Sequence, residues 1–294
     1  MAALRAAGHS VSLLAPSHAG AALLGRGPCE VDAVLPWESA IFAELLTDAT
    51  NVSADLRGAF EPFQALIAYT ASADLLRGLA HAAPSAQIVA QPPSPPSGPH
   101  AAYWLAKAVA ALAARPDVTP PTFVPSAVEA AQAKPWLDRL RPGFLAIHPG
   151  SGSPRKNWPA ARFAALAERR AGGKPFLLVE GPADADATAP ARALPGAVRA
   201  RDLPPRVLGA VLAHAGLYVG NDSGVSHLAA AWGAPVLALF GPTDPAQWAP
   251  IGPRVTVRRA RDEKMESLEL EEVEEAARET PRAASLDANR SKGK

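Results

Sequence analysis

The chain contains a single cysteine, Cys29, and so cannot form an internal disulfide. No apolar run approaches the roughly 18 residues that a membrane-spanning helix needs. The first residues also lack the basic and then apolar pattern of a signal peptide. Neither sign of charge dominates, because 29 Lys and Arg stand against 28 Asp and Glu. The basic excess of many nucleic-acid-binding proteins is therefore missing. These absences predict a cytoplasmic protein without a nucleic-acid partner.

Short apolar stretches alternate with helical stretches along most of the chain. Examples of predicted strands are residues 10–15, 65–70, 144–148 and 176–179. Strands and helices in alternation favour the α/β class with parallel, doubly wound sheets. At 294 residues the chain suits two domains that each bury a core of their own.

The sequence predicts two domains and a C-terminal segment. The first domain is expected over residues 1–140, and the second over residues 141–261, starting near Arg141-Pro142-Gly143. Residues 262–294 are predicted to form a Glu-rich helix, over about 265–279, followed by a disordered polar tail.

The stretch from residue 217 to residue 245 reads as strand, polar loop, helix and strand, which is one βαβ unit. The loop lies where a strand ends and a helix begins, the place where open α/β sheets bind ligands. The backbone N–H groups of Ser223, Gly224 and Val225 should point at this place. The helix dipole adds roughly half a positive charge there, so the expected ligand is a phosphate group.

Two motifs resemble those of a known family. The first is Asp222-Ser223-Gly224-x-x-His227-Leu-Ala-Ala-Ala, followed by Phe240-Gly241-Pro242-Thr243-Asp244-Pro245-x-x-Trp248-x-Pro250. The second is His148-Pro149-Gly150-x-Gly152 with Lys156-x-Trp158-Pro159. Both are similar to motifs of glycosyltransferase family 9, the bacterial lipopolysaccharide heptosyltransferases and their relatives. The resemblance covers roughly residues 1–270. It implies the GT-B architecture, in which two Rossmann-like domains face each other across a cleft.

The loop at residues 150–153 is the first candidate part of a donor site. Its N–H groups, with those of Ser151 and Gly152 among them, can form a concavity that binds an anion. Taken alone, such a glycine-serine loop is better explained as a plain connecting loop. The resemblance implies that Lys156 contacts the phosphates of a nucleotide-sugar donor. The alternative is that Lys156 is a solvated lysine on the surface.

Asp222, Ser223, Gly224 and His227 are the second candidate part. Asp222 or Ser223 could simply cap the helix that follows. The resemblance instead implies that Asp222 contacts the donor sugar, and that the N–H groups of Ser223 and Gly224 hold the diphosphate. His227 should lie on the same helix face, where the alternative is a packed or capping histidine.

An acidic residue at the end of the strand 176–179 is a third candidate. The resemblance implies that a carboxylate near this position contacts the adenosine of the donor, and a ribose diol suits such an acceptor. Asp184 is the preferred residue, with Glu180 as its competitor and helix capping by Asp184 as the alternative. Thr243 and Asp244 lie at the same sheet edge, where a turn built by Gly-Pro-Thr-Asp-Pro explains them equally well.

The reaction implied by the resemblance is transfer of a sugar, expected to be heptose from ADP-heptose, to a lipid-linked acceptor of the lipopolysaccharide core. Direct displacement inverts the anomeric carbon, with Lys156 and Asp222 as catalytic residues. No metal-ligand cluster is evident and no cofactor is expected. The protein should be a monomer that meets its acceptor at the cytoplasmic face of the inner membrane.

The general base is the part of this reaction that no residue matches. Residues 5–16 resemble the family segment that follows its first helix, whereas the family's strand and Asp-containing loop come before it. Two rivals follow: a nucleotide-sugar-binding protein without transferase activity, and another GT-B enzyme such as a nucleotide-sugar epimerase. The genomic reading frame ahead of Met1 separates a misplaced start codon from a real loss.

Overall fold

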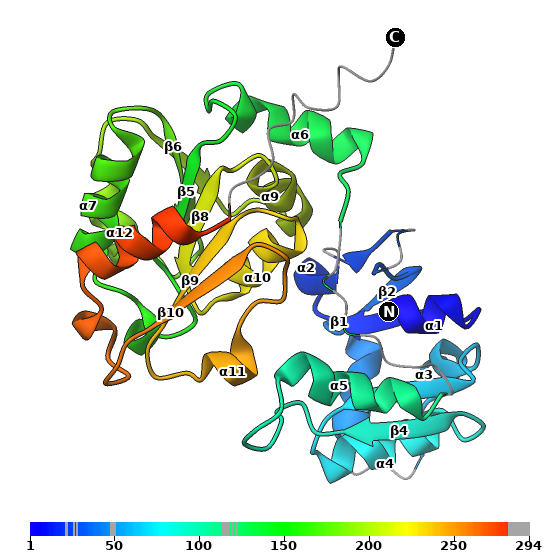
Figure 1. Ribbon diagram of the computed structural model, residues 1–294. Helices are drawn as coiled ribbons and strands as arrows, with labels where there is room; N and C mark the ends of the chain where they lie inside the picture. Colours follow the sequence, from blue (N-terminus) through cyan, green and yellow to red (C-terminus); the bar gives the residue numbers. More distant parts are fainter. Residues whose placement is uncertain are drawn as a thin grey trace. The chain divides into compact units, whose positions relative to one another are not determined.

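The computed structural model describes residues 1–20, 23–25, 27, 29–47, 51–112, 118, 120 and 123–281 (Figure 1). The chain divides into two compact units, residues 1–119 and 120–294. The division therefore falls earlier than the predicted boundary at residue 140. The reason is α6 (Ala127–Leu137), which packs on α9 (Pro205–Leu212) of the second unit and pairs its Glu129 with Arg206. Residues 123–140 thus belong with the second unit.

The second unit is built on one parallel sheet of six strands. Its order is β10 (Val255–Arg259), β9 (Val236–Phe240), β8 (Leu217–Asn221), β5 (Leu145–His148), β6 (Phe176–Glu180) and β7 (Ala197–Arg201). Every residue of β5, β6, β8 and β9 is buried. Burial on both faces is what parallel strands under two layers of helices require, and it explains their continuous apolar sequences.

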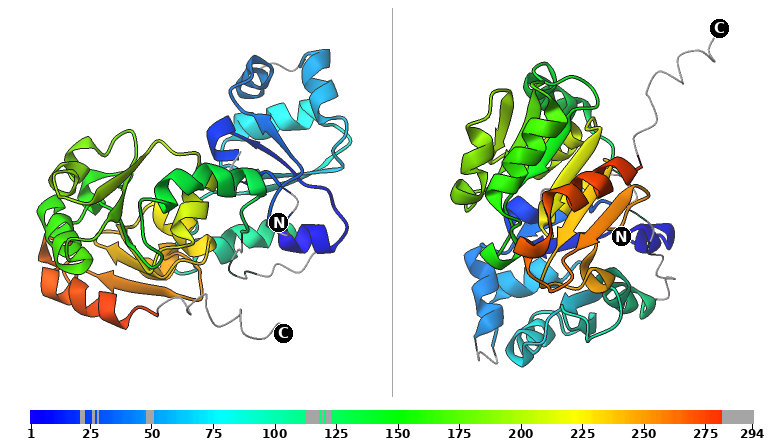
Figure 2. Two further views of the ribbon diagram at one scale, coloured as in Figure 1. Left: turned by 90° about the horizontal axis from the view of Figure 1, so that it is seen from above. Right: turned by 60° about the vertical axis from the view of Figure 1, so that its left-hand side comes forward.

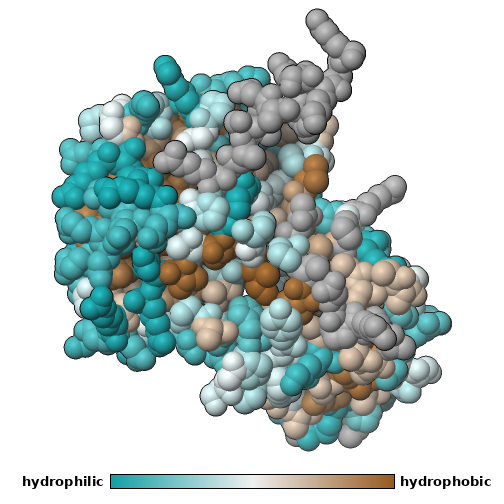
Figure 3. Space-filling model, viewed as in Figure 1, coloured by the Kyte–Doolittle hydropathy of each residue, from teal (hydrophilic) through white to brown (hydrophobic). Residues whose placement is uncertain are grey.

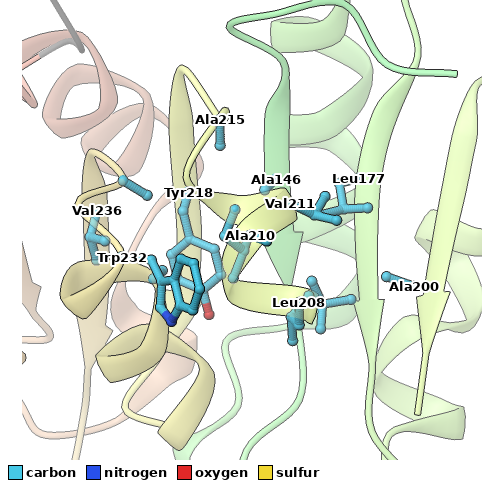
Figure 4. Packing of buried hydrophobic residues seen from close by; sticks show 14 of the residues in the cluster. Ala146, Leu177, Ala200, Leu208, Ala210, Val211, Ala215, Tyr218, Trp232 and Val236 are labelled. Atoms are coloured by element: carbon cyan, nitrogen blue, oxygen red, sulfur yellow. The ribbon is translucent and has the colours of Figure 1, made fainter. Parts of the chain in front are cut away.

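Helices cover both faces of this sheet. Alternate strand residues such as Leu217 and Val219 point toward α7 (Ala160–Ala171), α8 (Ala185–Arg192) and α12 (Leu270–Glu279). Their neighbours, including Tyr218, point toward α6, α9 and α10 (Gly224–Ala231). Figure 4 shows Val211 of α9 beside Ala146 and Leu177 of the sheet, with the Trp232 ring next to Tyr218. The predicted doubly wound arrangement is thereby confirmed for this unit.

The Glu-rich helix predicted over residues 265–279 is a 3-10 turn, η4 (Met265–Ser267), followed by α12. Both views in Figure 2 show α12 running alongside β10. Arg162 of α7 pairs with Glu269 at 2.8 Å, just before α12 begins. Hydrophilic side chains cover the surface over α7 and α12 (Figure 3), so α12 buries one face and exposes the other. Most of the tail predicted to be disordered, residues 282–294, lies outside the described residues.

In the part of the first unit that the structure describes, four strands form two parallel pairs. β1 (Ser12–Ala15) pairs with β2 (Ala33–Pro36), and β3 (Ala65–Tyr69) pairs with β4 (Gln87–Gln91). Both pairs pack on one apolar cluster centred on Phe42, Leu45, Leu56 and Phe60. Core contacts, rather than a ladder of hydrogen bonds, therefore link the two pairs among the described residues.

The helices of the first unit surround these pairs. They are α1 (Ala2–Ala6), α2 (Ser17–Gly20), η2 (Ala40–Leu46), α3 (Ala54–Phe60), α4 (Ala73–Ala82) and α5 (Ala101–Ala110). Ser72 caps α4, because its hydroxyl accepts the N–H of Leu75 at 3.2 Å. No helix in the described part of the chain is long and apolar enough to cross a membrane.

Candidate functional site

The candidate site lies at the carboxyl ends of β5 and β8, which are neighbours at the centre of the six-stranded sheet. From β5 the chain moves outward to β6 and β7, and then returns to place β8 on the other side of β5. The two loops that follow β5 and β8 therefore leave in opposite directions. Such a switch point is where open α/β sheets form ligand sites.

Two groups of backbone N–H donors lie in the loops at this switch point. The N–H groups of Ser223, Gly224 and Val225, at the start of α10, have no hydrogen-bond partner among the described residues. In the same part of the chain, the N–H groups of residues 150–152 after β5 also have none. Free N–H groups at a helix start and in a Gly-rich loop attract an anion. Both loops therefore carry N–H groups without partners in the described chain, and their binding of an anion stays a prediction.

The loop after β5 is held in place by Asn221, the last residue of β8 and a fully buried one. Its amide donates to the Pro149 carbonyl at 2.7 Å and accepts the Trp158 N–H at 3.0 Å. Within the loop, Ser151 Oγ lies 2.6 Å from Asn157 Oδ1 and 2.7 Å from the Ser153 carbonyl. Sequence reasoning missed Asn221, although it stands directly before the Asp-Ser-Gly motif.

Lys156 and Asp222 meet at the site. Lys156 Nζ donates to Asp222 Oδ2 at 3.0 Å, and Thr243 Oγ1 donates to the same oxygen at 2.9 Å. The other oxygen, Oδ1, has no hydrogen-bond partner among the described residues. The loops after β5, β8 and β9 therefore bring together the Lys156 ammonium, the Asp222 carboxylate and the Thr243 hydroxyl. One of the two carboxylate oxygens accepts both hydrogen bonds.

Neither Asp222 nor Ser223 caps α10 with its side chain. Ser223 occupies the N-cap position, yet no side-chain cap bond forms. Its hydroxyl lies instead 3.2 Å from His148 Nδ1, while Asp222 is engaged by Lys156 and Thr243. The capping alternative is therefore not what these side chains do, and the first N–H groups of the helix stay open.

Asp184 lies at the start of α8 and is buried. Its Oδ2 accepts from His148 Nε2 at 2.9 Å and from the Gly181 N–H at 2.7 Å. The hydrogen bond from His148 is the main reason why the pKa of Asp184 is held below its usual value. Nothing in the sequence pattern pointed to this pair, because 36 residues separate its members. A direct contact between Asp184 and a ligand stays a prediction.

Glu180, the alternative to Asp184, also forms its contacts with other residues of the protein. It is buried at the end of β6 and pairs with Arg192 at 2.8 Å and with Arg199 at 2.7 Å. Burial disfavours its charged form, but the hydrogen bonds from the two arginines outweigh burial and lower the pKa of Glu180. Both arginines lie on the second unit, so Glu180 ties α8 and β7 to β6.

The remaining predicted residues take different places. His227 is exposed one turn into α10, and its N–H donates to the Ser223 carbonyl at 3.4 Å. Its role stays a prediction. Trp158 is a packing residue, buried edge-on against Phe163 with its indole N–H on the Leu268 carbonyl at 2.7 Å. Trp248 is partly buried and packs against the apolar cluster that includes Tyr218 and Trp232.

Two neighbouring glycines of the loop should respond differently to alanine. A Cβ on Gly150 would overlap the Asp184 carboxylate, whereas Gly152 has open space around it. Gly150→Ala is expected to lower the free energy of unfolding by about 1–3 kcal/mol. Gly152→Ala is the matched control and should change it by less than about 0.5 kcal/mol. Urea unfolding midpoints check this pair, and equal effects would contradict the described fit of Asp184.

Comparison with known proteins finds a matching family and a relative of known name. A family model described as glycosyltransferase family 9 (heptosyltransferase) matches residues 94–277. Lipopolysaccharide heptosyltransferase 3 of Escherichia coli is 34% identical over 119 residues, which are 36% of this chain and 34% of that protein. The match thus spans about a third of that relative.

Solved structures extend the likeness to the whole fold. A family 9 glycosyltransferase of Veillonella parvula has a TM-score of 0.76 at 17% identity, covering 94% of this chain and 89% of its own. E. coli heptosyltransferase WaaC, solved with ADP, has a TM-score of 0.65 at 20% identity, covering 95% and 94%. These likenesses confirm the predicted GT-B fold class.

Proposed function

The chain belongs to glycosyltransferase family 9, the heptosyltransferase family, and on that premise we propose that it transfers a sugar from a nucleoside-diphosphate donor. The donor proposed is ADP-heptose, and the acceptor is a saccharide of the lipopolysaccharide core that is linked to lipid. The observation that carries the proposal is the set of free N–H groups on both sides of the switch point, with Lys156 beside them.

The diphosphate of the donor fits these groups by charge and by hydrogen bonding. It offers only acceptor oxygens, and the free N–H groups of residues 150–152 and 223–225 are donors without competing partners in the described chain. Preorganised donors and a cation stabilise the charge that grows on a leaving group. ADP bound to E. coli WaaC supports adenosine as the nucleoside of the donor.

Asp222 suits the donor sugar. Its Oδ2 is held by Lys156 and Thr243, which leaves Oδ1 able to accept a sugar hydroxyl. In the proposed reaction the acceptor hydroxyl attacks the anomeric carbon, the bond to the diphosphate breaks, and the configuration inverts. The attacking hydroxyl gives its proton to a general base, to which no residue is assigned.

The direct test is incubation with ADP-heptose, with and without a lipopolysaccharide core acceptor, followed by mass spectrometry of the products. UDP-glucose serves as the control donor. The proposal expects heptose on the acceptor with ADP-heptose only. ADP-heptose binding without any product would favour the nucleotide-sugar-binding alternative. Altered stereochemistry of the donor when no acceptor is present would favour an epimerase.

A further inference from the structure

A buried histidine links two of the strand ends that form the site. His148 ends β5 and is only 4% exposed. Its Nε2 lies 2.9 Å from Asp184 Oδ2, and its Nδ1 lies 3.2 Å from Ser223 Oγ. Asp184 and Ser223 are both at least nine-tenths buried. The three side chains therefore form one continuous hydrogen-bonded row beneath the loops that carry the free N–H groups.

The chemistry of the row decides the direction of each hydrogen bond. Asp184 also accepts the Gly181 N–H at 2.7 Å, and an ionised carboxylate can only accept. His148 Nε2 therefore carries the hydrogen that points to Asp184. In the neutral ring the other nitrogen, Nδ1, is then an acceptor, so the Ser223 hydroxyl donates its hydrogen to His148.

This engagement changes what a serine at an N-cap ordinarily does. A serine hydroxyl at this position normally accepts the N–H of the second or third residue of the helix. In α10 those residues are Val225 and Ser226, and the hydroxyl of Ser223 makes no such bond. A hydroxyl that turned back onto α10 would occupy a donor that the diphosphate is proposed to use.

We propose that His148 and Asp184 are positioning residues, which hold the Ser223 hydroxyl off the start of α10 and so leave its N–H groups to the donor diphosphate. This inference rests on the proposed function of the site. In this proposal the pair acts on the diphosphate through Ser223. Its effect is on nucleotide affinity, because it removes a competing acceptor from inside the protein.

The proposal predicts an unusual rescue. His148→Gln keeps an amide that can donate to Asp184, but its single polar end cannot also hold Ser223. We expect ADP affinity to fall about tenfold, equivalent to about 1.4 kcal/mol. Ser223→Ala removes the competing hydroxyl, so the loss caused by His148→Gln should disappear in that background. The double variant should bind ADP within about twofold of the Ser223→Ala single variant.

Isothermal titration with ADP on the parent and the three variants completes this double-mutant cycle. Thr280→Val is the control for a buried hydroxyl lost away from the row, since Thr280 is buried and its hydroxyl donates to the Ala276 carbonyl at 2.9 Å. It should leave ADP affinity within about twofold. Thermal unfolding of every variant shows that each is folded.

The outcomes distinguish a failure of the proposed function from a failure of the role given to His148 and Asp184. A parent protein that does not bind ADP contradicts the proposed function itself. A parent that binds, with His148→Gln equally weak in both Ser223 backgrounds, assigns His148 a packing role only and overturns the inference. An unchanged affinity in His148→Gln overturns it as well, whereas loss followed by rescue supports it.

Discussion

Replacing Lys156 by alanine is expected to weaken ADP-heptose binding at least tenfold and to lower transfer by about 10²- to 10³-fold. The Lys156 ammonium lies 3.0 Å from Asp222 and beside the N–H groups that receive the diphosphate in this account. Without the ammonium group, the departing diphosphate loses a cation that neutralises its negative charge. The negative charge of Asp222 is also left unbalanced. Both effects oppose the anionic ligand.

Titration calorimetry and a transfer assay measure the two parts of this prediction. Arg155→Ala is the matched control, because Arg155 is an exposed cation in the same short helix, η3 (Pro154–Lys156). It should change either quantity by less than about threefold, as expected of an exposed charge. Similar losses for both variants would mean that only the general charge of the surface matters, and would contradict the role given to Lys156.

Asp222→Asn should separate the sugar from the nucleotide. The proposed role of Asp222 is to accept a sugar hydroxyl at Oδ1, while its charge stands close to the diphosphate. Removing that charge should leave ADP affinity unchanged or raise it. Transfer from ADP-heptose should nevertheless fall by about 100-fold, because a neutral amide is the weaker acceptor in the transition state.

Comparison of ADP with ADP-heptose therefore tests this role. Asp244→Asn is the control, since Asp244 is an exposed carboxylate near the same sheet edge that caps α11 (Pro245–Trp248). Asparagine caps helices as well as aspartate does, so transfer should be retained. If Asp222→Asn weakened ADP and ADP-heptose by the same factor, Asp222 would serve the nucleotide and not the sugar.

The parts of the site that the sequence predicted are local in the chain. The loop 150–153 and the motif from Asp222 to Gly224 each follow a short apolar strand, and the place of a loop between a strand and a helix can be read from a few residues. Lys156 and Asp222 were both singled out, and the fold brings their side chains together across 66 residues of chain.

What the sequence did not predict depends on contacts between distant residues. His148 looked like the last residue of an apolar strand, and only the packing of β5 between β6 and β8 brings it to Asp184 and Ser223. Asn221 is similar, because its partners Pro149 and Trp158 follow another strand. A single-sequence pattern contains no signal for such pairs.

The first unit and the domain boundary were also harder to predict. Residues 123–140 follow a proline-rich stretch that looks like part of the first domain, yet Arg206 and Trp232 bind them to the second unit. β7 was missed because it is an edge strand with alternating arginines, of sequence Ala-Val-Arg-Ala-Arg, and its exposed residues resemble a loop.

The central claim is that a nucleoside diphosphate binds on the free N–H groups of residues 150–152 and 223–225. Titration of the ¹⁵N-labelled chain with ADP, followed by amide NMR, tests it most directly, with adenosine as the control ligand. The account predicts that ADP shifts the amide signals of these two segments most strongly and that adenosine leaves them nearly unchanged. ADP shifts that leave both segments unaffected, or that centre on another part of the chain, would contradict it.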